Sequence, residues 1–512
     1  CRPLPAAVVG GEVEVHQLLG EVALAPAPVD AEVLDQKARH HHAQPVVHVA
    51  AAVELVHRRV DQRVAGAALA PGGEAPGAAG ETQVLELGPE GVAEVIGLFV
   101  NDASTLTAAM RLGLESGDFG MLGLDDEALE EVRRQFRRFV ESEVAPHAHG
   151  WHLRDELIPL PVVQKMAELG VFGLTVPEEW GGLGMGKLAM CVVTEELSRG
   201  YIGVGSLGTR SEIAAELIRA GGTEEQKKKY LGRIASGEIL PTAVFTEPNT
   251  GSDLASLKTR AVLEGNVYKV HGNKTWITHA ARADVMTLLV RTDPATSDYR
   301  GLSMLLAPKP RGVEGNDFPA EGMSGGEIEV LGYRGMKEYE IAFDGWFVPE
   351  ENLVGGPEGE GRGFYLQMAG FENGRLQTAA RAVGVMQAAY ESAVDYANNR
   401  AVFGNNIAEY QLTRVKLGRM AVLIQAGRQF GYQVARLMAK GVGTTEASMV
   451  KAYVCKAAEW VSREAMQIHG GYGYAEEYSV SRLFVDARVL SIFEGADETL
   501  CLKVIARRLT EK

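Results

Sequence analysis

The segment AVFTEPNTGSD, residues 243–253, lies where the sequence changes from helical to β-prone patterns. It therefore marks the boundary between a helical part and a β part of the fold. Before it, residues 129–144 repeat apolar side chains at intervals of three and four, which predicts an amphipathic helix that stops at Pro146. After it come three short β-prone runs separated by turn residues: 267–270, 286–290 and 303–306. A helical block therefore gives way to a β block at this segment.

Further helical patterns flank these runs on both sides. Upstream they occupy 161–170, 187–198 and 211–220, and downstream, with few helix breakers, 363–398, 407–438 and 445–468. We therefore predict an α+β multidomain protein. Its parts are an α-helical domain at 120–240, a β domain at 241–358 and an α-helical bundle at 359–512.

The first 119 residues differ from the rest. Six of the twelve histidines precede residue 60, and PGGEAPGAAG at 71–80 is linker-like. Two interpretations stay open, a genuine but poorly ordered extension and a mis-assigned start. The histidines at 40–42 and His48 lack acidic or thiol partners, which favours a solvated polar stretch over a metal site.

Composition excludes several classes of protein. The formal charge of −16 over 512 residues has the wrong sign for a phosphate backbone, which excludes nucleic acid as a partner. No apolar run reaches the roughly 18 residues that cross a bilayer, and the opening lacks the order of a secretory signal, so we expect no membrane span and no targeting segment. The four cysteines lie far apart without metal-ligand spacing, which predicts no metal site and reduced thiols in the cytoplasm.

The segment 243–253 is also the first of four motifs with chemical character. Gly251 lets the backbone approach a ligand closely, and Thr246 and Ser252 offer hydroxyls beside exposed amides. A simple turn would account for Pro248 and Gly251 alone. It would not account for all eleven positions.

The second motif is GNKTWITHA, residues 272–280. Trp276 offers a flat apolar face and Thr278 a hydroxyl. A tryptophan in a strand is, however, often only part of the core, and taken singly this motif leaves both interpretations open.

The third motif is RAVFGNNIAEYQ, residues 400–411, with QIHGGYG at 467–473. Arg400 carries a permanent charge on a planar fork, which suits phosphate oxygens. Alone, Gly470 and Gly471 would indicate a helix C-cap.

The fourth motif is LSIFEGADETL, residues 490–500, with Glu494 at its centre. Phe493 and Gly495 give a compact, apolar setting, and desolvation makes a carboxylate more basic. A carboxylate of raised basicity can remove a weakly acidic proton next to a thioester while the enolate is stabilised.

Together these motifs resemble the acyl-CoA dehydrogenase family from about residue 120 to the C-terminus. The resemblance implies an N-terminal all-α domain, a middle β-barrel-like domain and a C-terminal four-helix bundle. It implies FAD as the cofactor, an acyl-CoA substrate, electron-transfer flavoprotein as the electron acceptor and a homodimer or homotetramer.

The resemblance also assigns residues to the cofactor. Those expected around the flavin ring are Phe245, Thr246, Gly251, Ser252, Trp276, Ile277 and Thr278. Those expected to reach the pyrophosphate and adenine of a neighbouring subunit's FAD are Arg400, Phe403, Gln411, Gln467, Gly470 and Gly471. The family commonly has Thr and Gln where Ala496 and Glu498 stand here, so part of this contact set stays open.

For the reaction, Glu494 occupies the position of the catalytic base in one branch of the family. It is expected to take the α-proton while the β-hydrogen leaves as hydride to flavin N5. Its backbone amide and a flavin ribityl hydroxyl would bond the thioester oxygen. Ser252, Arg375 and Gly495 are expected to contact the substrate.

Three longer strings, at 151–174, 191–218 and 325–340, resemble the branch that oxidises (2S)-methylsuccinyl-CoA to mesaconyl-CoA in the ethylmalonyl-CoA pathway. That substrate carries a free carboxylate, which needs a cation or several donors when buried. Arg210 is the candidate. Arg334 and Lys337 are rival cations, and Arg210 could instead pair with Glu212.

Three other functions stay open. One is a generalist short-chain acyl-CoA dehydrogenase and another is an acyl-CoA oxidase on the same scaffold. The third is a non-catalytic CoA-binding scaffold protein that uses residues 1–119 as an interaction arm. These functions can share one fold, so only the residues of the site can distinguish among them.

Overall fold

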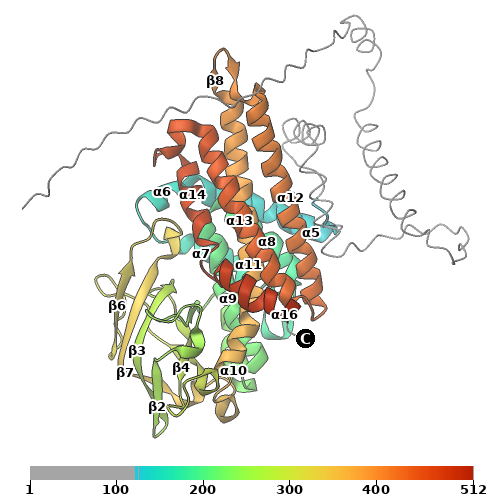
Figure 1. The fold of residues 1–512 in the computed structure, drawn as a ribbon. Coiled ribbons are helices and arrows are strands. Elements are labelled where there is room, and N and C mark those ends of the chain that lie inside the picture. Colours follow the sequence, from blue (N-terminus) through green and yellow to red (C-terminus); the bar gives the residue numbers. More distant parts are fainter. Residues whose placement is uncertain (1–121, 125, 511–512) are drawn as a thin grey trace, which may run out of the picture. The chain divides into compact units, whose positions relative to one another are not determined.

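The computed structural model describes residues 122–124 and 126–510, shown as the coloured ribbon in Figure 1. Helices come first, a sheet follows, and a second set of helices completes the chain. The predicted extension at 1–119 and its histidine run lie outside the described residues.

The first set of helices begins with α5 (Glu127–Phe139). Asp126 caps it, because its carboxylate accepts the Ala128 N–H at 2.9 Å. A π-helical turn, Val140–Val144, leads directly into α6 (Ala145–Leu153), so the prediction that the helix stops at Pro146 was wrong. Pro146 lies in the first turn of α6, where a missing N–H and a fixed φ are tolerated.

The other helices of this set are α7 (Leu160–Glu168), α8 (Lys187–Gly200), α9 (Ile202–Gly221) and α10 (Glu224–Ala235). The prediction of a helix at 211–220 missed the first half of α9. That half contains Gly203, Gly205 and Gly208, which lower helix propensity. A Cβ at Gly205 would collide with Ser198 Oγ of α8, so glycine permits a close packing that outweighs its low propensity.

Seven strands form one mixed sheet in the middle of the chain. They are β1 (Pro241–Val244), β2 (Arg260–Glu264), β3 (Val267–Thr278), β4 (Val285–Arg291), β5 (Leu302–Pro308), β6 (Met323–Ile328) and β7 (Glu338–Pro349). Their order is β1-β4-β2-β3-β7-β6, with β5 also paired to β4. The three predicted β-prone runs lie in β3, β4 and β5.

The second set of helices is dominated by α11 (Gly363–Asn399), an unbroken helix of 37 residues. It is followed by a small hairpin, β8 (Ala401–Val402) with β9 (Asn405–Asn406), and then by α12 (Gln411–Ala439), α13 (Thr444–His469), α14 (Ser479–Val489), α15 (Asp497–Thr499) and α16 (Arg507–Thr510). In Figure 1 the β8 hairpin lies at one end of the bundle, and the sheet lies beside the other end.

A shared apolar core joins the two sets of helices. Within it, Arg428 of α12 contacts Glu195 of α8 at 2.6 Å, and both side chains are buried. The Tyr432 hydroxyl also donates to Glu195, at 3.1 Å. Because the charges are paired and hydrogen-bonded, this ion pair can lie inside the core.

This architecture confirms the predicted fold class: helices, a curled sheet, and a C-terminal bundle built on the three long helices α11, α12 and α13 with the shorter α14. Within the part of the chain that the structure describes, no helix has both the length and the apolar character needed to cross a membrane.

Candidate active site

Glu494 lies in the loop between α14 and α15, and its backbone is unusual. Its φ is +55°, in the left-handed region, and the following Gly495 has φ +97°. Lys451 of α13 fixes this loop, because its Nζ donates to Gly495 O at 2.7 Å and to Asp497 Oδ1 at 3.0 Å. The loop therefore directs the Glu494 side chain inward, where it is only 5% exposed.

The Glu494 carboxylate meets two helices. Its Oε1 accepts from Arg210 Nη2 of α9 at 3.1 Å. Its Oε2 is buried and has no hydrogen-bond partner among the described residues. A Cβ built on Gly374 of α11 would lie 2.9 Å from this oxygen, so the helix approaches it closely only because the residue is glycine. Arg210 thus holds one carboxylate oxygen, and the other faces Gly374 without a partner among the described residues.

We expect Gly374→Ala to lower kcat/KM about 10-fold while leaving the fold intact, because the added methyl group displaces the carboxylate of Glu494, the base expected from the sequence, and small misplacements of a reacting group are costly. Steady-state kinetics beside a thermal melt would measure this. Gly370→Ala is the matched control, since its Cβ would meet Ile213 at an ordinary 3.5 Å. Equal activities of the two variants would contradict the prediction.

The three candidate cations, Arg210, Arg334 and Lys337, have different partners in the structure. Glu212, the suggested partner of Arg210, instead contacts Lys187 at 2.8 Å. Arg334 donates to two backbone carbonyls, and Lys337 Nζ contacts Glu327 at 2.5 Å. Of the three candidate cations, Arg210 is the one that contacts Glu494.

The segment 243–253 leaves β1 and is held by a buried ion pair. Lys274 Nζ of β3 donates to Phe245 O at 2.8 Å and contacts Glu247 Oε1 at 3.2 Å. Burial lowers the pKa of Lys274 to about 8. At the far end, Thr499 Oγ1 contacts Ser252 Oγ at 3.2 Å, which brings this motif to the Glu494 loop. Thr246 and Gly251 lie between these two anchors, and Gly251 has open space around its Cα.

Trp276 protrudes from β3 because the strand is irregular there. The pairing with β7 shifts register between Lys274 and Ile277, and Trp276 has φ +59°. A β-bulge of this kind re-aims a side chain. The indole stays 56% exposed on the sheet, whereas Ile277 is buried.

Thr278 forms a hydrogen bond with Glu338, which lies outside the four motifs. Its hydroxyl donates to Glu338 Oε1, the first residue of β7, at 2.8 Å. Burial raises the pKa of Glu338 to about 7. Glu338 lies in the string 325–340, in which only Arg334 and Lys337 were predicted as candidate site residues.

We expect Glu338→Gln to become more stable relative to the wild type as pH rises. The difference between their free energies of unfolding should change by about 2 kcal/mol between pH 5 and pH 8. In the wild type, the pKa of Glu338 is raised in the folded state above the unfolded value of 4.5. The contribution of this side chain to stability is therefore fully present below pH 4.5 and is lost as pH rises through about 7. Chemical denaturation at both pH values measures the difference. Glu340→Gln, an exposed acid on the same strand, is the control. A difference independent of pH would contradict the assignment.

The remaining predicted cofactor residues gather elsewhere, at the hairpin end of the bundle. Arg400, Gly470 and Gly471 line one cavity of about 540 Å³, and the Arg400 guanidinium lies 5.9 Å from the Tyr472 ring. A Cβ on either glycine would meet nothing within 4 Å. Gln411, Gln467 and the hairpin residue Phe403, which is 94% exposed, are solvent-accessible as well.

Helix α11 shows how far the Arg400 group lies from Glu494. Gly374, beside Glu494, precedes Arg400 by 26 residues, which corresponds to about 39 Å along the helix axis. The cavity at Arg400 therefore lies far from the Glu494 carboxylate along the bundle.

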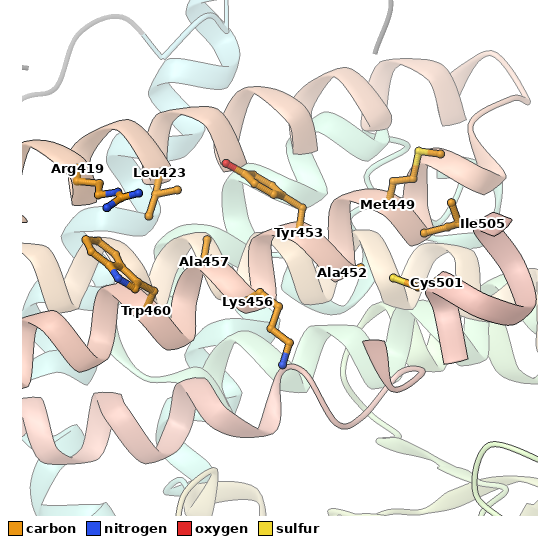
Figure 2. A pocket seen from close by; sticks show the side chains of 10 residues that line it. All are labelled: Arg419, Leu423, Met449, Ala452, Tyr453, Lys456, Ala457, Trp460, Cys501 and Ile505. Atoms are coloured by element: carbon orange, nitrogen blue, oxygen red, sulfur yellow. The ribbon is translucent and has the colours of Figure 1, made fainter. Parts of the chain in front are cut away.

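A second cavity, of about 590 Å³, lies between α12, α13 and the segment before α16. Figure 2 shows Arg419 and Trp460 at one end of it and Met449 and Ile505 at the other. None of the predicted site residues lines it. Among residues 126–510, no cluster of three or more metal-ligating side chains is present either.

Positive φ values concentrate on these motifs. Of the seven described non-glycine residues with positive φ, four lie in three of the motifs: Trp276 and His279 in the second, Phe403 in the third and Glu494 in the fourth. Side chains other than Asn and Asp rarely adopt this conformation, which costs free energy and occurs preferentially at functional sites.

The residues present fit the cofactor that the sequence resemblance implies. The exposed indole of Trp276 and the hydroxyl of Thr278 suit a flat, polar-edged ring. The cavity at Arg400, with two glycines that leave open space, suits a diphosphate. Arg375, expected near the CoA, is buried on α11; its Nη1 donates to Ser448 Oγ at 3.3 Å, and its Nε has no partner among the described residues.

Comparison with known proteins gives consistent matches along this part of the chain. Three family profiles match: acyl-CoA dehydrogenase N-terminal domain at 126–238, middle domain at 242–346 and C-terminal domain at 361–510. The chain is 59% identical over 407 residues to (2S)-methylsuccinyl-CoA dehydrogenase of Cereibacter sphaeroides, covering 79% of this chain and 74% of that protein.

Two solved structures share the fold. A glutaryl-CoA dehydrogenase from Mycobacterium smegmatis in complex with FADH2 is 27% identical, with a TM-score of 0.69 over 76% of this chain and 95% of its own. A chain from work on the electron transferring flavoprotein of Acidaminococcus fermentans is 31% identical, with a TM-score of 0.71 over 77% of this chain and all of its own.

Proposed function

The chain belongs to the acyl-CoA dehydrogenase family, and from that premise we propose that it oxidises (2S)-methylsuccinyl-CoA to mesaconyl-CoA with Glu494 as the base. As a member of the family it is an FAD-dependent oxidoreductase that acts on acyl-CoA thioesters. The observation that carries the proposal is the buried Glu494 carboxylate, with one oxygen on Arg210 and the other without a partner among the described residues.

In the proposed mechanism Glu494 Oε2 takes the proton from the α-carbon of the thioester. The backbone N–H of Glu494 stabilises the oxyanion that forms on the thioester oxygen. A bound FAD would supply the acceptor for the hydride from the β-carbon. Arg375 is proposed to contact the CoA portion, and Ser252 and Gly495 are proposed to position the acyl group.

The cofactor contacts are proposed as two sets. Phe245, Thr246, Gly251, Ser252, Trp276, Ile277 and Thr278 would surround the flavin ring, where Trp276 excludes water from one face. Arg400, Phe403, Gln411, Gln467, Gly470 and Gly471 would hold the pyrophosphate and adenine of a neighbouring subunit's cofactor. The length of α11 between Gly374, which lies beside Glu494, and Arg400 supports this division.

The free carboxylate of the substrate is proposed to bind Arg210. Arg210 is buried on α9 and contacts Glu494, so a negative group bound to it would lie next to the base. The name of the relative at 59% identity supports the same substrate. Electron-transfer flavoprotein as the acceptor, a homodimer or homotetramer, a cytoplasmic location and a place in the ethylmalonyl-CoA pathway remain predictions from the sequence.

The test is anaerobic addition of (2S)-methylsuccinyl-CoA to the purified yellow holoenzyme while flavin absorbance is followed, in parallel with butyryl-CoA. Rapid bleaching by methylsuccinyl-CoA would support the proposal. Bleaching by butyryl-CoA alone would contradict the carboxylated substrate and favour a generalist short-chain enzyme. Oxygen consumption without any added acceptor would indicate an oxidase.

A further inference from the structure

Arg381 of α11 is one of the largest completely buried side chains among the described residues. Its guanidinium donates only to hydroxyls: to Ser206 Oγ at 2.9 Å, Thr209 Oγ1 at 3.0 Å and Thr378 Oγ1 at 2.5 Å. Its Nε has no partner within the described part of the chain. Neutral hydroxyls satisfy hydrogen-bonding capacity but do not neutralise a charge.

Three other buried cations of the described residues are paired with a carboxylate, whereas Lys309 donates to backbone carbonyls and Arg375 to a serine hydroxyl. Lys274 contacts Glu247, Lys451 contacts Asp497, and Arg428 contacts Glu195, each within 3.2 Å. A buried charge without a counter-charge is costly, so an anion that binds beside it would lower that cost. Arg381 has no carboxylate within 4 Å among the described residues, which sets it apart from these three.

Its position connects Arg381 to the candidate active site. The guanidinium lies over the ring of Phe493, the neighbour of Glu494, at 5.0 Å from the centroid. Two of its hydroxyl partners, Ser206 and Thr209, lie on α9, the second of them adjacent to Arg210. Ser206 also contacts the buried hydroxyl of Tyr333, whose ring meets Phe493 edge to face at 5.4 Å.

Around Glu494, the buried positive charges outnumber the buried negative charges. Two buried guanidinium groups, Arg210 and Arg381, lie near Glu494, and the Nε of each is without a partner among the described residues. The other nearby acid, Glu338, has a pKa raised by burial to about 7 and so is neutral for part of the time at physiological pH. A carboxylate accepts hydrogen bonds from arginine in a planar geometry and supplies the missing negative charge.

We propose that Arg381 is a specificity-determining residue that, together with Arg210, binds the free carboxylate of the acyl-CoA substrate. This inference rests on the proposed oxidation of methylsuccinyl-CoA. When the carboxylate binds, it replaces part of the contact between Arg210 and Glu494 and leaves the Glu494 carboxylate free to accept the proton. A substrate that carries a methyl group in place of the carboxylate leaves both arginines as they are, so it is oxidised less efficiently.

The test compares wild type and Arg381→Gln as holoenzymes, with (2S)-methylsuccinyl-CoA and with methylbutyryl-CoA, in which a methyl group stands in place of the carboxylate. We expect kcat/KM for the charged substrate to fall about 30-fold and kcat/KM for the neutral one to change less than about threefold, as for loss of one buried charged contact. Arg428→Gln is the control, because it removes a buried arginine far from Glu494 and should not change the ratio of the two substrates.

An equal loss with both substrates, as in a purely structural role that joins α9 to α11, would overturn the inference while leaving the proposed function intact. Wild-type enzyme that oxidises methylbutyryl-CoA but not methylsuccinyl-CoA would overturn both. If Arg381→Gln does not fold, a crystal structure of wild-type holoenzyme with mesaconyl-CoA decides. A product carboxylate in contact with the Arg381 guanidinium supports the inference, and one beyond 4 Å from it refutes it.

Discussion

Glu494→Gln should lower turnover of the acyl-CoA substrate about 10⁴-fold, the largest effect that general base catalysis commonly supplies. Glutamine keeps the size of the side chain and can still bond to Arg210, but its amide does not accept the α-proton. Substrate affinity should change only a few-fold, because the carboxylate acts on the reacting proton. Single-turnover bleaching of the flavin, with flavin content and melting temperature checked beside it, measures the effect.

Glu340→Gln is the control for that experiment, since Glu340 is an exposed acid on β7 and belongs to none of the predicted site residues. It should retain wild-type turnover. Residual activity of Glu494→Gln within 10-fold of wild type would remove Glu494 from the role of base and would require another buried acid in its place.

Arg210→Met should lower kcat/KM for methylsuccinyl-CoA by about 10²- to 10³-fold, which corresponds to about 3 to 4 kcal/mol of lost binding in the transition state. The methionine fills similar volume without charge, so the substrate carboxylate loses its cation. Oxidation of methylbutyryl-CoA should stay within a few-fold of wild type or rise, because Glu494 is no longer paired.

Arg219→Met offers the comparison for this variant, since Arg219 lies on the same helix but forms an exposed ion pair with Glu216. Arg219→Met should change kcat/KM for neither substrate. If Arg210→Met left methylsuccinyl-CoA turnover intact, the carboxylate would have to bind elsewhere, and the generalist short-chain function would gain weight.

The fold was predictable from the sequence wherever one periodicity ran without interruption. Helices α8, α11 and α13 and strands β3 to β5 come directly from such patterns. The two errors have a common cause. Pro146 and the glycines of α9 are poor helix formers in isolation, yet one sits in a first turn and the others permit close helix contact, which only the folded chain shows.

The site was predictable where residues occur in contiguous motifs, and their assigned roles stay predictions. The contact between Arg210 and Glu494 was not predictable, because 284 residues separate the two side chains. Glu338 and Arg381 were missed for the same reason. Arg381 did leave a signal, since it stands alone between small and apolar residues in AARAVGV, where an unpaired charge is unexpected.

The left-handed backbone at Trp276, Phe403 and Glu494 has a consequence for how this protein can evolve. Glycine adopts that conformation without steric cost, so replacing any one of the three removes a penalty of about 1 kcal/mol. A laboratory selection for heat tolerance alone would therefore favour glycine at these positions, at the expense of the roles proposed for the three side chains. Among natural relatives, a glycine at position 494 would be expected only where the acid that takes the α-proton stands elsewhere in the sequence.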